Sequence, residues 1–158
     1  MRNLCMNLKE LDNNELLVRL RKAIDTERRI SAEVVELLAE IDRRKLYLEL
    51  GYSSLFALLT EEMGYAPGTA QRRIDAARLL RQIPEIREDL RSGSLNMTQV
   101  SAIARAVRES GGGAPQARDI LSEARGRSLA YTEMLIAQRT GRAPVTWERP
   151  RTQADGST

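Results

Sequence analysis

The stretch "MGYAPGTAQRRIDAARLL" (residues 63–80) decides how this chain folds. Gly64 favours a tight turn, and Pro67 favours the first turn of a helix that we expect to run to about Gln82. One face of this helix is apolar and carries Ala70, Ile74, Ala77 and Leu80. The opposite face is polar and carries Gln71, Asp75, Arg78 and Gln82. We therefore expect the first face to pack and the second to be free to bind a partner.

The residues before this stretch predict a shorter helix. Ser53 or Ser54 can cap it and Gly64 ends it, so residues 53–82 form a predicted helix-turn-helix-like unit in which the small Ala70 lets the two helices approach closely. The start of the second helix could then enter the major groove of DNA. Short helical corners with a glycine also occur in proteins that bind no nucleic acid, so the motif alone leaves both alternatives open.

A helical hairpin is expected in the N-terminal part of the chain. Asp12 and Glu15 have the spacing of a capping box, and Ser31 can cap a second helix that Gly51 ends. Each of the two segments repeats its apolar residues with helical spacing. We therefore predict two paired helices within residues 12–48.

The glycines of "SGGGA" (residues 110–114) predict a flexible joint between two helical parts. Two helices, opened at Pro84 and capped by Asn96, precede it, and two more follow it. A polar, proline-bearing and aperiodic segment ends the chain. The predicted division is a helical domain over 1–109, a C-terminal helical pair over 115–141 and a disordered tail or linker over 142–158.

The composition predicts an all-α protein, a multi-helix bundle that contains the helix-turn-helix-like unit. Hydrophobic residues make up 42% of the 158 residues but aromatic residues only 4%, a balance that suits helices packed on helices. The single cysteine, Cys5, can form no internal disulfide, which suggests a reducing compartment. The first residues include no apolar stretch of signal-peptide length. We therefore expect a cytoplasmic protein that does not enter a membrane.

The sequence contains no histidine. Histidine is the usual general base near neutral pH and the commonest metal ligand, so its absence excludes most hydrolase mechanisms. A carboxylate-only site would need a pair such as Glu61 and Glu62, but adjacent residues of a helix point in different directions. We therefore predict no enzyme activity, no metal, no cofactor and no small-molecule substrate.

A longer run of sequence resembles the N-terminal helical region of a bacterial family of HNH endonucleases. In that family "LGYSSL…LGYS…A.RRI.AAR" precedes "IPE…L..G.LNLTQ", as it does here from Leu50 to Gln99, and "ILSEARGRSLAYTEMLIAQ" (residues 120–138) is similar to a later segment. The resemblance covers about Leu8 to Pro144 and implies a helical, DNA-associating region. The family's nuclease lies downstream and uses histidines that this sequence lacks, so no catalytic residue is carried over. The chain is then either a stand-alone relative or a piece of a longer protein.

Two functions from different classes remain. The first is a non-catalytic module for double-stranded DNA, in which phosphate contacts supply most of the affinity and groove contacts supply any sequence preference. The residues expected at the major groove are Gly68, Thr69, Gln71 and Arg72, and those expected at phosphates are Arg73, Arg78 and Arg81. A helix-turn-helix this small usually works as a dimer, which predicts a homodimer. The second function is a helical protein-interaction or dimerisation module that binds no DNA.

Overall fold

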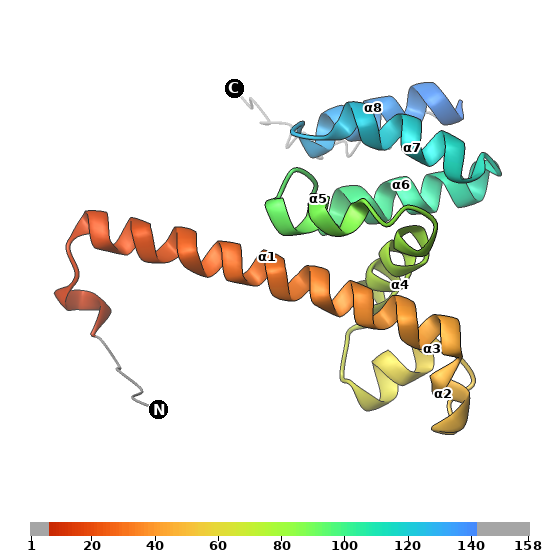
Figure 1. Cartoon of the computed structure of the whole chain (residues 1–158), viewed down its shortest axis with the longest axis horizontal. Coiled ribbons are helices and arrows are strands. Elements are labelled where there is room, and N and C mark those ends of the chain that lie inside the picture. The colour runs from red at the N-terminus through yellow and green to blue at the C-terminus, as the bar shows by residue number, and fades with distance from the viewer. Residues whose placement is uncertain (1–6, 142–158) are drawn as a thin grey trace, which may run out of the picture.

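The computed structural model describes residues 7–141, which fold into helices joined by short connections (Figure 1). No strand occurs within this range, and the predicted all-α bundle is confirmed. In chain order the elements are η1 (Leu8–Glu10), α1 (Asn13–Arg44), α2 (Leu46–Glu49), α3 (Leu55–Ala57), η2 (Leu58–Glu62), α4 (Pro67–Gln82), α5 (Ile86–Ser92), α6 (Met97–Ser110), α7 (Gly113–Ala124) and α8 (Leu129–Thr140). The predictions for Cys5 and for residues 142–158 lie outside the described residues.

Helix α1 is continuous from Asn13 to Arg44, so the hairpin predicted within residues 12–48 is wrong. The capping box at its start is confirmed: the Asp12 side chain accepts from the N–H of Glu15, and the Glu15 side chain accepts from the N–H of Asp12. Ser31 does not begin a new helix, because neither glycine nor proline interrupts the run of helix-forming residues around it. The helix ends only at Lys45, whose φ of 53° is left-handed.

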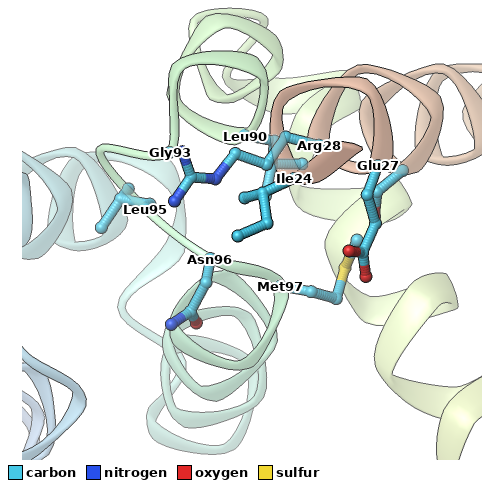
Figure 2. A pocket seen from close by; sticks show the side chains of 9 residues that line it. Ile24, Glu27, Arg28, Leu90, Gly93, Leu95, Asn96 and Met97 are labelled. Atoms are coloured by element: carbon cyan, nitrogen blue, oxygen red, sulfur yellow. The ribbon is translucent and has the colours of Figure 1, made fainter. Parts of the chain in front are cut away.

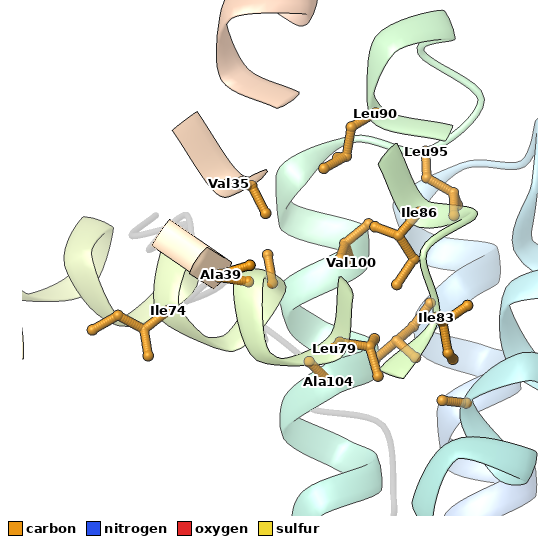
Figure 3. Close-up of a cluster of buried hydrophobic side chains, with 14 of the residues drawn as sticks. Val35, Ala39, Ile74, Leu79, Ile83, Ile86, Leu90, Leu95, Val100 and Ala104 are labelled. Carbon is orange, nitrogen blue, oxygen red and sulfur yellow. The ribbon is translucent and has the colours of Figure 1, made fainter. Parts of the chain in front are cut away.

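Helix α4 lies at the centre of the bundle. It packs against α1 on one side and α6 on another, while α5 also packs on α1, and α7 and α8 pack on α6. Figure 3 shows where apolar side chains of three elements meet, with Val35 from α1, Leu79 from α4 and Val100 from α6. The apolar face predicted for α4 is confirmed by the burial of Ala70, Ile74 and Ala77.

Within the glycine-rich residues 110–114, Gly111 and Gly112 form a short turn between α6 and α7. Gly111 ends α6 with a left-handed φ of 73°, and α7 begins two residues later. Side chains from the two helices, including Ile103 and Ile120, belong to the same buried cluster. Gln99 also joins α6 to α8, because its Nε2 donates to Thr132 Oγ1 at 3.0 Å. The division of the chain into domains stays a prediction.

The first half of α1 projects from the bundle, and only the short η1 lies near its start (Figure 1). From Asn13 to Ile30 every residue except Ile24 is exposed, whereas Ala32, Val35 and later residues enter the core. Within the described range no helix combines the length and the apolar character that crossing a membrane requires.

Candidate nucleic-acid interface

The turn before α4 is built around Gly64 and Tyr65. Gly64 has a φ of 74°, which glycine adopts at little cost, and the N–H of Tyr65 donates to the carbonyl of Leu59 at 3.0 Å. Ala66 is extended and Pro67 is the first helical residue, where its missing N–H is harmless. The predicted start of this helix is therefore confirmed. The helix-turn-helix-like unit over 53–82 stays a prediction, since the short α3 is followed by a π-helical segment, η2.

The first turn of α4 is open to solvent. No side chain caps it at Ala66, so the N–H groups of Gly68 and Thr69 have no capping acceptor. Arg72 is exposed and takes part in none of the ion pairs found within residues 7–141. Its guanidinium lies near Gly68, where an added Cβ would stand 3.9 Å from Arg72 Nη1. The positive end of the helix dipole and the charged Arg72 guanidinium thus lie close together.

Two other predicted site residues are turned toward the protein. The Arg73 guanidinium lies over the Tyr65 ring, 5.0 Å from its centroid, and its Nε is buried without a hydrogen-bond partner among the described residues. The Gln71 side chain donates to Asp75 Oδ1 at 2.9 Å. Both residues border the open turn, but each already has a contact within the chain.

Asp75 corrects the prediction of a free polar face on α4. It is 5% exposed, and Arg108 of α6 reaches its Oδ1 at 2.6 Å. A helical pattern separates two faces of a helix but does not say whether a second neighbour covers the polar one. Here α6 covers it, so the expectation that the face of Gln71, Asp75, Arg78 and Gln82 is free is wrong at Asp75.

Arg78 and Arg81 form a separate group toward the other end of α4. Their side chains lie 3.5 Å and 3.0 Å from Asp42 Oδ2, and Asp42 is only 9% exposed. These contacts join α4 to α1. The structure therefore brings Gly68, Thr69 and Arg72 together but places Arg78 and Arg81 on a buried acid that sequence reasoning missed. Nothing local indicates that pair, because Asp42 and Arg81 are 39 residues apart.

A hollow of about 350 Å³ lies between α1 and the connection from α5 to α6 (Figure 2). Its charged lining consists of Glu27 and Arg28, and the Arg28 guanidinium lies close against Gly93. One carboxylate beside one guanidinium is no arrangement for acid–base catalysis. Within the described part of the chain no three His, Cys, Asp or Glu side chains are grouped to hold a metal. The open turn of α4 therefore remains the candidate site.

A family model described as a domain of unknown function (DUF222) matches residues 17–139. The match covers most of the 158 residues, so the chain belongs to this family. No curated protein and no solved structure matches the chain.

Proposed function

Starting from a DUF222 domain whose description names no activity, we propose that this chain is a non-catalytic helical module that binds double-stranded DNA. The observation that carries the proposal is the open start of α4, where Arg72 is exposed beside uncapped N–H groups. The resemblance to the N-terminal regions of HNH endonucleases supports it, since such a region would hold DNA for a nuclease without cutting it.

Backbone phosphate is the chemical group that suits this turn. The first N–H groups of a helix point along its axis, and the helix dipole adds partial positive charge, so an anion binds there favourably. Gly68 presents no side chain that would keep a phosphate away, and Arg72 can donate to the same group. Contacts of this kind position a protein on the duplex and depend little on sequence.

The proposed contact set is narrower than the one expected from sequence. Gly68, Thr69 and Arg72 form its centre, because Gly68 and Thr69 lie in the open turn and the Arg72 guanidinium lies near Gly68. Arg73 can add long-range positive potential from its place over Tyr65. Arg78 and Arg81 are assigned instead to the buried Asp42, since binding phosphate would require them to leave it.

The experiment is a titration of a labelled random-sequence duplex, followed by fluorescence anisotropy at about 50 mM and about 200 mM salt. Arg72→Ala should weaken binding and lower the slope of log affinity against log salt by about one, with an unchanged melting temperature. Arg21→Ala is the matched control, since Arg21 is an exposed arginine in the first half of α1 and not in α4.

The proposal is overturned if the parent chain binds no duplex at the lower salt, or if Arg72→Ala binds as the parent does at both. Equal losses in Arg72→Ala and Arg21→Ala would also overturn it, because binding would then follow net charge alone. The protein-interaction hypothesis would take its place.

A further inference from the structure

The first half of α1 carries an apolar stripe that the rest of residues 7–141 leaves largely exposed. Leu16, Leu20 and Ile30 are 39%, 54% and 55% exposed, and the stripe continues to the half-buried Val34. Isolated exposed leucines are ordinary, but a row of them along one helix face is typical of an interaction surface. The stripe is therefore a candidate surface for binding another helix.

The spacing of the stripe is that of a coiled coil. Leu16, Ala23, Ile30 and Leu37 follow one another at intervals of seven, as do Leu20, Glu27, Val34 and Ile41. The two series alternate as the a and d positions of a heptad, so they form a seam for a second helix. Glu27 is the one charged residue in this seam.

The seam is hollowed near its N-terminal end. Leu8 of η1 lies opposite Leu16, Leu20 and Ala23 around an open hollow of about 550 Å³. The lining is mainly apolar, with Arg19 and Lys22 at its edge. Branched aliphatic side chains of another helix, such as those at the other end of this same stripe, suit such a hollow.

We propose that the seam is occupied by α1 of a second copy of this chain, running antiparallel and centred near Asp25. In this register Leu20 of each copy faces Ile30 of the other, and Leu16 faces Val34. Along one edge of the seam, Arg19 of each copy faces Glu33 of the other. The same two residues therefore form two ion pairs, one at each end, and this charge complementarity argues for a second copy as the occupant.

The antiparallel direction follows from Glu27. In a parallel pair at the same register, each a position faces itself, so two Glu27 carboxylates would meet within an apolar seam. In the antiparallel pair Glu27 faces Ala23, and its carboxylate can reach solvent past the small side chain. The antiparallel arrangement also keeps the two bundles at opposite ends of the paired helices.

Charge-reversal variants test the proposed contact between Arg19 and Glu33. Arg19 and Glu33 are 14 residues apart on one helix, about 21 Å, so they cannot pair within a single copy. In sedimentation equilibrium the parent should reach twice the mass of the 17.8 kDa chain. Arg19→Glu and Glu33→Arg should each weaken self-association roughly tenfold or more. The double variant should return to within about threefold of the parent, because the pairs re-form with opposite sign.

Two further variants separate the seam from the rest of the helix. Leu20→Glu should give a monomer with unchanged helical circular dichroism, since Leu20 is exposed in the single chain. Val18→Glu is the control, because Val18 is 40% exposed on the opposite side of the same helix. A monomeric parent at about 100 μM overturns the proposal. So does a dimer that tolerates Leu20→Glu, or a double variant that stays as weak as the single ones.

Discussion

The two halves of α1 both carry apolar residues with helical spacing, but their surroundings differ. Leu17 and Val35 stand on the same side of the helix, five turns apart, yet Leu17 is 51% exposed and Val35 is 0% exposed. The later half packs on α4 and α5, whereas the earlier half remains exposed at every residue from Asn13 to Arg28 except Ile24. A periodic apolar pattern thus predicts a helix and an apolar face, but the rest of the fold decides whether that face belongs to the core or to a partner.

The largest expected effect tests this contrast directly. Val35→Asp should lower the free energy of unfolding by several kcal/mol or prevent folding, because it places an unpaired charge in the core. Leu17→Asp makes the same chemical change in the exposed half and should shift the stability by about 0.5 kcal/mol or less. Urea unfolding at low protein concentration, followed by circular dichroism, measures both. If the two variants unfold alike, the first half of α1 is covered in solution and the contrast fails.

The next effect concerns two aspartates on α1. Asp42 is buried against Arg81 and Arg78, so Asp42→Ala should cost about 1–3 kcal/mol. Asp25 lies 3.7 Å from Arg28 with both side chains largely exposed, so Asp25→Ala should change stability by less than about 1 kcal/mol. Thermal unfolding at neutral pH compares them. A mild Asp42→Ala would contradict the assignment of Arg78 and Arg81 to a structural pair and return them to the DNA-binding candidates.

Local signals predicted much of this fold. The capping box at Asp12, the cap at Asn96, the proline that opens α4 and the burial of Ile74 are confirmed, because each depends on neighbours within one or two turns of helix. The predicted hairpin is wrong because its signal was also only local. Ser31 is a residue type that often caps the start of a helix, but a new helix begins there only if something interrupts the helix before it.

The sequence predicted only the part of the candidate site that depends on residues close together in the chain. The exposure of Arg72 follows from its place near the start of α4, on the side of the helix opposite Ala70 and Ile74. The partners of Asp75 and Asp42 lie 33 and 39 residues away along the chain, and only the packing of α6 and α1 against α4 brings them together. Long-range pairs of this kind leave no periodic signal in a single sequence.

The smallest expected effect concerns surface charge on the covered half of α1. Glu40 accepts from Arg43 Nη2 at 2.6 Å and from Arg44 Nε at 2.7 Å, and these bonds, that of Arg43 first, lower the pKa of the Glu40 carboxyl from 4.5 to about 2. Because the pKa is lower in the folded chain, the stabilisation is complete above pH 4.5 and is lost as the pH falls toward 2. The contribution is small, since all three side chains are exposed to solvent and salt. Glu40→Gln should therefore lower the melting temperature slightly at neutral pH and not at all once the pH is well below 2, and side-chain carboxyl NMR should follow the Glu40 titration. A Glu40 that titrates near 4.5 would show that these two arginines do not hold it in solution.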